Sequence, residues 1–128
     1  MKNNIKMLLV FRNEIYRNCL KDVLKSIMPD KFWIDCETGK DAQKILKNEL
    51  IDIMLIEINS KNQFNFNFIP NIIKTNPQTK IVVLTDLQLI SKVYELNVDA
   101  FIRDFSDLNS IYSTIEKLQK ECKEVLLF

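Results

Sequence analysis

The chain has 128 residues, 47% of them hydrophobic, and a formal net charge of +1. This length suits one compact domain over residues 1–128, and the near-neutral charge gives no reason to expect nucleic acid or an anionic membrane as a direct partner. The sequence has no histidine and one glycine. These absences exclude histidine-dependent nucleophile systems, most zinc sites and glycine-rich phosphate loops. Together with the pocket residues described below, they lead us to expect no enzyme, no cofactor and no metal.

The cysteines Cys19, Cys36 and Cys122 are odd in number and widely spaced. This pattern argues against a disulfide framework and fits a reducing, cytoplasmic compartment. We interpret all three as small buried hydrophobic side chains. No apolar run approaches the roughly 20 residues that a membrane-spanning helix needs, so we expect no membrane partner.

Apolar runs and helical spacing predict strands and helices in alternation. A buried strand over residues 5–10 precedes a helix over 13–27 that Asn13 can cap. The predicted inward face of this helix consists of its apolar positions: Ile15, Tyr16, Cys19, Leu20, Val23, Leu24 and Ile27. A short strand follows over residues 32–36, and Thr38 opens a second helix.

The middle of the chain contains the most apolar strand, over residues 51–58, which carries a single acid, Glu57, near its carboxyl end. A run this apolar is typical of a strand buried on both faces of a parallel sheet. A third helix over residues 66–73 must hold Pro70 in its first turn to tolerate it. Another buried strand covers residues 80–85.

The last third predicts a short helix over residues 88–96, a strand core over 100–102 and a final helix from 107 to about 122, capped by Ser106. The inward residues predicted for the final helix are Leu108, Ile111, Tyr112, Ile115 and Leu118. Five strands alternating with five helices predict an α/β fold with a doubly wound, five-stranded parallel sheet.

Several short motifs in this order resemble the receiver domain of bacterial two-component response regulators, a CheY-like superfamily, with the NarL type nearest. Residues 52–57 line up with the D-x-x-L-L-D strand of that family, and residues 77–85 with its P-x-T-K segment that ends in threonine. Asp99-Ala100-Phe101 matches the D-G-Y before the fifth strand. The resemblance covers the whole chain and implies a flavodoxin-like (βα)5 fold.

The family's chemistry is phosphoryl transfer to an aspartate at the end of the third strand, with two acids after the first strand holding Mg²⁺. In this sequence the phosphoacceptor position is Glu57, and the two acid positions are Phe11 and Arg12. An apolar ring and a guanidinium leave no cage for a divalent metal. The longer Glu57 side chain is also misplaced for in-line attack. We therefore expect that Mg²⁺-dependent phosphorylation is lost.

Three further pocket positions follow from the resemblance. Thr85 keeps the threonine that contacts the phosphoryl group in the family, and Phe101 stands at the family's switch aromatic. The family's lysine position falls on Asp104 in a gapless alignment, or on Arg103 after a slip of one residue. Read without the resemblance, Thr85 is an ordinary strand residue and Phe101 a core phenylalanine.

In place of the metal site we expect an ion pair between Arg12 and Glu57, with Asp104 on the other side of Arg12. The alternative is that Glu57 is a partly solvated acid at the end of a strand, where an ion pair contributes roughly 0–1 kcal/mol.

The resemblance implies an atypical, phosphorylation-independent receiver domain, acting in signal transduction or transcription regulation through protein contact. The expected partner is a second copy of the chain or another protein, through the last helix and the fifth strand. Residues 121–128 resemble the segment that leads to a helix-turn-helix domain, so DNA binding would belong to a missing C-terminal domain. The alternatives are a phosphorylatable receiver and a flavodoxin-like module that binds a small ligand.

Overall fold

The computed structural model describes residues 4–59, 64–86, 89–103 and 107–122. One sheet of five parallel strands has the order β2-β1-β3-β4-β5. The strands are β1 (Lys6–Val10), β2 (Phe32–Cys36), β3 (Ile53–Ile58), β4 (Lys80–Thr85) and β5 (Ala100–Ile102). The helices are α1 (Glu14–Ile27), α2 (Gly39–Asn48), the 3₁₀ helix η1 (Phe64–Phe68), α3 (Ile69–Thr75), α4 (Ile90–Val93) and α5 (Leu108–Gln119).

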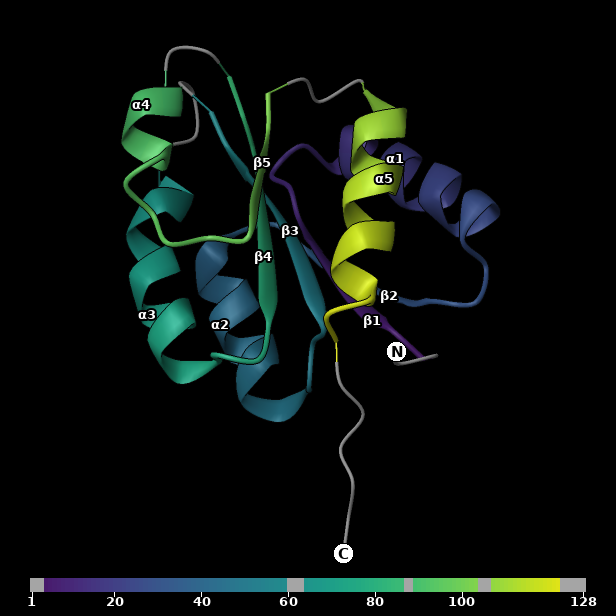
Figure 1. The fold of residues 1–128 in the computed structure, drawn as a ribbon, viewed down its shortest axis with the longest axis horizontal. Helices are drawn as coiled ribbons and strands as arrows, with labels where there is room; N and C mark the ends of the chain where they lie inside the picture. Colours follow the sequence, from purple (N-terminus) through teal and green to yellow (C-terminus); the bar gives the residue numbers. More distant parts are fainter. Residues whose placement is uncertain (1–3, 60–63, 87–88, 104–106, 123–128) are drawn as a thin grey trace, which may run out of the picture.

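The helices cover both faces of the sheet (Figure 1). Helices α1 and α5 lie on one face, and α2, α3 and α4 lie on the other. This is the doubly wound, flavodoxin-like α/β fold that the sequence predicts. None of the helices in the described part of the chain combines the length and apolar character needed to cross a bilayer.

Strand β3 is the centre of the sheet and is hydrogen-bonded to β1 on one side and β4 on the other. Its side chains alternate between the two helical layers, because successive residues of a strand point to opposite faces. Ile53 and Leu55 belong to the core under α1 and α5, while Met54 and Ile56 belong to the core under α2 and α3. All four are fully buried, which explains why this strand has no polar alternation until Glu57.

The predicted starts of the first two helices are confirmed. The Asn13 side chain accepts a hydrogen bond from the Tyr16 amide at 2.9 Å, and that of Thr38 accepts one from the Asp41 amide at 3.2 Å. The predicted cap Ser106 lies outside the described residues, and Asp107 caps α5 instead, accepting from the Ser110 amide at 3.0 Å. Both residue types are strong caps, so the sequence places the helix start only to within one residue.

The predicted inward face of α1 is wrong at several positions. Only Leu20 and Leu24 of the helix are buried. The side chains that we expected inside and that lie exposed are Ile15 (77% exposed), Cys19, Val23 (38%) and Ile27 (45%). A helix packed against a sheet contacts it along one line, so an apolar stripe wider than that line remains outside.

Helix α5 shows the same mismatch, and α4 is shorter than expected. Leu108 and Tyr112 are exposed at 36% and 39%, whereas Ile111, Ile115 and Leu118 are buried as predicted. Helix α4 covers four residues in place of the predicted span over 88–96. Pro70 does lie in the first turn of α3, where its missing N–H breaks no helical hydrogen bond.

A buried lysine ties the start of β2 to the end of α5. The Lys31 side chain is 2% exposed, and its Nζ donates a 2.8 Å hydrogen bond to Oε1 of Gln119. The carboxylates of Glu116 and Asp30 lie 3.8 Å and 3.9 Å from the same nitrogen. This arrangement balances the buried charge, so we assign Lys31 a structural role.

Candidate functional site

The carboxyl ends of β1, β3 and β4 meet at one edge of the sheet, the place where parallel α/β sheets bind their ligands. Phe11 directly follows β1, Glu57 is the penultimate residue of β3, and Thr85 is the last residue of β4. Ile58 and Thr85 are paired in the register of the sheet, which places Glu57 one residue from that pair. The predicted site residues of these strands therefore share one edge.

Phe11 is fully buried and held in place through its backbone. Its N–H donates to the Cys36 carbonyl at 3.1 Å, and its own carbonyl accepts a hydrogen bond from Nη1 of Arg17 at 2.7 Å. Its ring contacts the ring of Tyr16, with 5.6 Å between the centroids. An apolar ring therefore fills the position after β1, where a metal site would need oxygen ligands.

Arg12 points to solvent and takes part in none of the ion pairs among the described residues. The ion pair expected between Arg12 and Glu57 is therefore not seen in this part of the chain. The side chain of Phe11 occupies the inward direction, and the next residue consequently faces outward. Asp104, expected on the far side of Arg12, lies outside the described residues.

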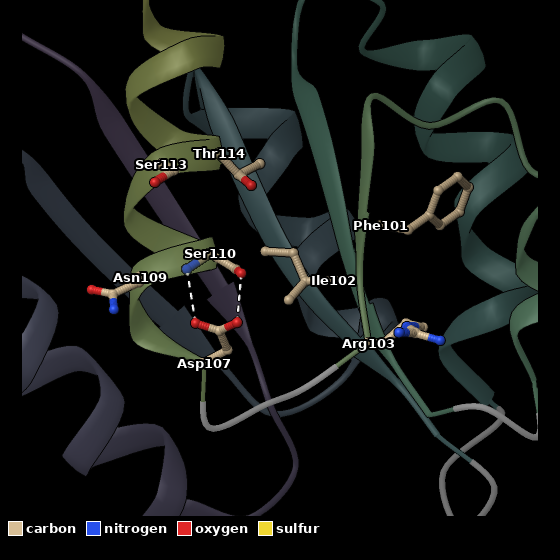
Figure 2. Close-up of a pocket in the computed structure, with 8 residues that line it drawn as sticks. All are labelled: Phe101, Ile102, Arg103, Asp107, Asn109, Ser110, Ser113 and Thr114. Carbon is tan, nitrogen blue, oxygen red and sulfur yellow. Dashed lines mark hydrogen bonds between the residues drawn. The ribbon is translucent and has the colours of Figure 1, made fainter.

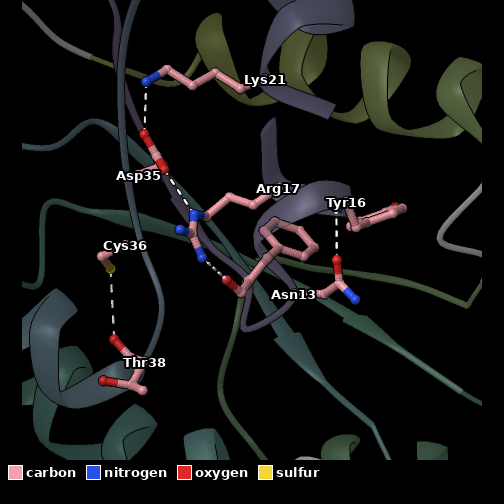
Figure 3. Close-up of polar contacts among 8 residues, drawn as sticks. Asn13, Tyr16, Arg17, Lys21, Asp35, Cys36 and Thr38 are labelled. Carbon is pink, nitrogen blue, oxygen red and sulfur yellow. Dashed lines mark hydrogen bonds and ion pairs between the residues drawn. The ribbon is translucent and has the colours of Figure 1, made fainter. Parts of the chain in front are cut away.

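At this end of the sheet, Arg17 is the arginine that forms an ion pair (Figure 3). Its Nε donates to Oδ2 of Asp35 at 2.8 Å, while Lys21 Nζ donates to Oδ1 of the same carboxylate at 2.7 Å. Partial burial would raise the pKa of Asp35, but the hydrogen bonds from Lys21 and Arg17 outweigh it and hold the pKa below its ordinary value. This network escaped the sequence analysis, although the i, i+4 spacing of Arg17 and Lys21 signals two cations on one face.

Glu57 is half-buried, and the segment around it is fastened by Asn65. Nδ2 of Asn65 donates to the Glu57 backbone carbonyl at 2.8 Å, and Oδ1 accepts from the Gly39 amide at 2.8 Å. Asn65 is 1% exposed. One amide side chain thus joins the end of β3, the start of α2 and η1.

Thr85 is fully buried at the end of β4. Its hydroxyl has a long 3.5 Å contact to the Asp86 carbonyl, at the limit of a hydrogen bond. No cluster of three or more Cys, Asp or Glu side chains that could hold a metal ion occurs in the described part of the chain, which also contains no histidine. The described part of this edge therefore offers a buried ring, the half-buried carboxylates of Glu57 and Asp86, and the buried hydroxyl of Thr85.

A second feature is an open pocket of about 810 Å³ between β5 and α5 (Figure 2). Polar side chains from α5 line one wall: Asn109, Ser110, Ser113 and Thr114. Ile102 points toward α5, whereas Phe101 points to the other side of the strand. The half-buried Phe101 ring lies 5.1 Å from that of Tyr94, which is 69% exposed.

Arg103, the alternative lysine position, is exposed and lines this pocket. Asp107 faces the same pocket, but its carboxylate is engaged by Ser110, whose hydroxyl donates to it at 2.6 Å. These hydrogen bonds from Ser110 lower the pKa of Asp107. The pocket is polar and open to solvent, unlike the enclosed and mostly apolar pockets that are typical for small molecules.

No protein-family model matches this sequence, and no curated protein matches it. Solved structures do match the fold. The response regulator TrrA from Thermotoga maritima, in complex with Mg²⁺ and BeF, has a TM-score of 0.78 at 19% identity, covering 89% of this chain and 98% of TrrA. The fold is that of a receiver domain.

Two further neighbours show the range of proteins that carry this fold. The response regulator RcsB from Salmonella typhimurium has a TM-score of 0.74 at 18% identity, covering 98% of this chain and 64% of RcsB. Another structure contains two RcsB dimers bound to two parallel DNAs. A protein described as an adenylate cyclase from Rhodopirellula baltica has a TM-score of 0.81 at 21% identity, covering 92% of this chain and 89% of its own. At these identities the likeness establishes the fold alone.

Proposed function

We propose that this chain is an atypical receiver domain that acts in signal transduction without phosphorylation. The observation that carries the proposal is the buried Phe11 ring directly after β1, at the position where the receiver family has a metal-binding acid. Mg²⁺ requires oxygen ligands in near-octahedral geometry. A buried phenyl ring supplies none, and the neighbouring Arg12 repels the cation.

Glu57 and Thr85 are the remnants of the phosphorylation pocket in this proposal. Phosphoryl transfer depends on the alignment of acceptor and donor to within fractions of an ångström, and Glu57 places its carboxylate one methylene farther from the backbone than aspartate does. Without a metal, the described residues of this edge offer the developing charge on the phosphoryl oxygens one buried hydroxyl, that of Thr85, while the guanidinium of Arg12 points to solvent. We propose that the pocket performs no catalysis.

The proposed output is a protein contact through β5 and α5, with a second copy of the chain or another protein as partner. The pocket between these elements presents hydroxyl and amide groups, and the neighbouring Tyr94–Phe101 pair adds an exposed aromatic surface. Aromatic side chains beside polar groups are typical of protein interfaces. RcsB, which shares the fold, is described as dimers on DNA. This is support by analogy.

We also propose that residues 121–128 lead toward a C-terminal DNA-binding domain, which would make the protein a transcription regulator. The net charge of the whole chain is +1, so its overall charge gives no reason to expect that it binds DNA without such a domain. The gene sequence beyond the codon for Phe128 tests this: a helix-turn-helix domain downstream supports it, and a stop codon overturns it.

A phosphorylation assay tests the main proposal. The chain is incubated with Mg²⁺ and a small-molecule phosphodonor, and the intact mass is measured at acidic pH and after mild alkaline treatment, which cleaves acyl phosphates. We expect no added phosphoryl group. The matched comparison is the triple variant Phe11→Asp, Arg12→Asp and Glu57→Asp, which restores the acids. A stoichiometric adduct on the unmodified chain would overturn the proposal.

A further inference from the structure

An exposed apolar stripe runs the length of α1. Its residues recur every fourth position: Ile15, Cys19, Val23 and Ile27. Ile15 is 77% exposed, and Val23 and Ile27 are 38% and 45% exposed. Single exposed apolar residues are ordinary, but a contiguous row of four along a helix marks an interaction surface.

The C-terminal end of the stripe lies beside α5. Each step of four residues turns the row by about 40°, so it winds by about 120° around the helix from Ile15 to Ile27, and the two central residues Cys19 and Val23 lie within about 40° of each other. Ile27 and Tyr112 line the same small pocket between the two helices. Leu108 and Tyr112 extend the exposed apolar surface onto α5. Figure 1 shows both helices on the same face of the sheet.

The order of sizes along the stripe is the same read in either direction. Isoleucine stands at both ends, and the smaller Cys19 and Val23 stand in the middle. Two such helices in antiparallel contact approach closely at the small central residues, where Cys19 of one copy meets Val23 of the other. The i, i+4 ridges then interlock in the commonest mode of helix packing. A surface that complements itself under a two-fold rotation is the requirement for a symmetric dimer.

The charges at the two ends of α1 are complementary in the same arrangement. Arg12, just before the helix, is exposed and forms no ion pair among the described residues. Asp30, just after it, is 65% exposed, with its nearest cation 3.9 Å away. An antiparallel pairing brings Arg12 of each copy to the end of the partner helix that carries Asp30. The dipoles of the two helices also oppose each other favourably.

We propose that α1 docks antiparallel on α1 of a second copy of this chain, with the stripe as its core and Arg12–Asp30 contacts at both ends. This goes beyond the proposed function, because it assigns self-association to the opposite side of α5 from the β5–α5 pocket. That pocket then stays available to a different protein.

A charge exchange tests the pairing in solution. The mass of the full chain is measured by sedimentation equilibrium over a range of concentrations, and we expect a concentration-dependent dimer. Arg12→Asp or Asp30→Arg alone should weaken the dimer by roughly tenfold or more, because like charges then face each other. The double exchange should restore it. Lys25→Asp, on another side of the helix, is the matched control and should leave the dimer unchanged.

Cross-linking gives a second, independent readout. In the proposed register Val23→Cys places a thiol opposite the natural Cys19 of the partner, within the Cα distance that a disulfide spans. Burial raises the pKa of Cys36 to about 12, and Cys122 is buried, so neither competes. Mild oxidation of the variant should give a covalent dimer that disappears when Cys19→Ser is added. Lys25→Cys should give none.

Two results would overturn the inference. One is a chain that stays monomeric at high concentration. The other is a dimer that the charge exchange leaves unchanged and that forms no disulfide cross-link in the Val23→Cys variant. A dimer abolished by Tyr94→Asp and unaffected by Arg12→Asp would move the interface to α4 and β5. That outcome would not bear on the proposed loss of phosphorylation, so each of the two proposals can be wrong without the other. Circular dichroism and urea unfolding check that each variant folds, above all Asp30→Arg, because the Asp30 carboxylate lies 3.9 Å from the nitrogen of the buried Lys31.

Discussion

The guanidinium of Arg17 donates a 2.7 Å hydrogen bond to the backbone carbonyl of Phe11. The same side chain is paired with Asp35 at 2.8 Å, so it fixes the turn after β1 against β2. In a receiver fold this turn would carry the metal ligands. Here a structural arginine holds it, and the buried ring of Phe11 lies in the interior.

Replacing Arg17 should destabilise the chain noticeably. Arg17→Ala removes two charge-assisted hydrogen bonds in a site that is 14% exposed, and we expect a loss of about 2–3 kcal/mol in the free energy of unfolding. Arg17→Lys should recover only part of this, because an ammonium cannot reach both acceptors with the geometry of the guanidinium fork. Urea unfolding measures the free energy of unfolding of both variants. Lys25→Ala, an exposed change on the same helix, should change the value by less than about 0.5 kcal/mol.

The stability of the chain should depend on pH through Asp35. The pKa of Asp35 is lower in the folded state than in the unfolded state. Its ionised carboxylate therefore contributes fully to the free energy of unfolding above the ordinary aspartate pKa of about 3.9, and this contribution is lost as the pH falls through the lower folded-state pKa. Asp35→Asn should therefore lower the urea midpoint at neutral pH and differ little from the natural chain in strong acid. A difference between the two chains that stays constant over the whole acid range would contradict this assignment.

Gly39, the one glycine of the chain, should not tolerate a larger side chain. A Cβ at this position would lie 2.6 Å from the Phe68 ring. Gly39→Ala gains up to about 1 kcal/mol in helix propensity but must displace the ring, and overpacking of this kind costs about 1–3 kcal/mol, so we expect a net loss of stability. The same change in a Phe68→Ala background, which removes the Cγ and Cδ2 atoms nearest to the added Cβ, should be better tolerated. Equal effects of Gly39→Ala in both backgrounds would show that the ring is not the obstacle.

Asn65 should be essential to the segment after β3. Asn65→Ala leaves the Gly39 amide and the Glu57 carbonyl without the partner that Asn65 supplies, and each such loss costs about 1–3 kcal/mol when the group is buried. Asn65→Asp keeps the acceptor for the Gly39 amide but sets a carboxylate beside the Glu57 carbonyl. This variant should therefore not recover the stability that Asn65→Ala loses. Asn67→Ala, on the exposed side of η1, is the control and should be near neutral.

The strands could be predicted from the sequence because each is a short apolar run ended by polar residues. β3 is the clearest case, since burial on both faces leaves no polar position before Glu57. The resemblance to receiver domains likewise rests on strand ends and turns, which local sequence specifies. The neighbours of known structure confirm the fold that these patterns predict.

The faces of the helices and the partners of the charges could not be predicted. Ile15 and Leu20 are equally apolar, and only the way α1 packs against the sheet decides that Leu20 is buried while Ile15 is not. Arg12 is the cation nearest in sequence to the expected metal site, whereas in the structure Arg17 forms the ion pair and the hydrogen bond that hold this turn. In the sequence, Asn65 is one of several polar residues that follow the third strand. Its role depends on Gly39, 26 residues away.

The most direct test of the central claim is the response of the chain to Mg²⁺ with beryllofluoride, the combination bound in the TrrA structure. Backbone amide spectra are recorded with and without the two additives, for the natural chain and for the Phe11→Asp, Arg12→Asp, Glu57→Asp variant. We predict that the spectrum of the natural chain stays unchanged around Phe11, Glu57 and Thr85. Saturable, Mg²⁺-dependent shifts of these amides in the natural chain would show a working phosphorylation pocket and contradict the account.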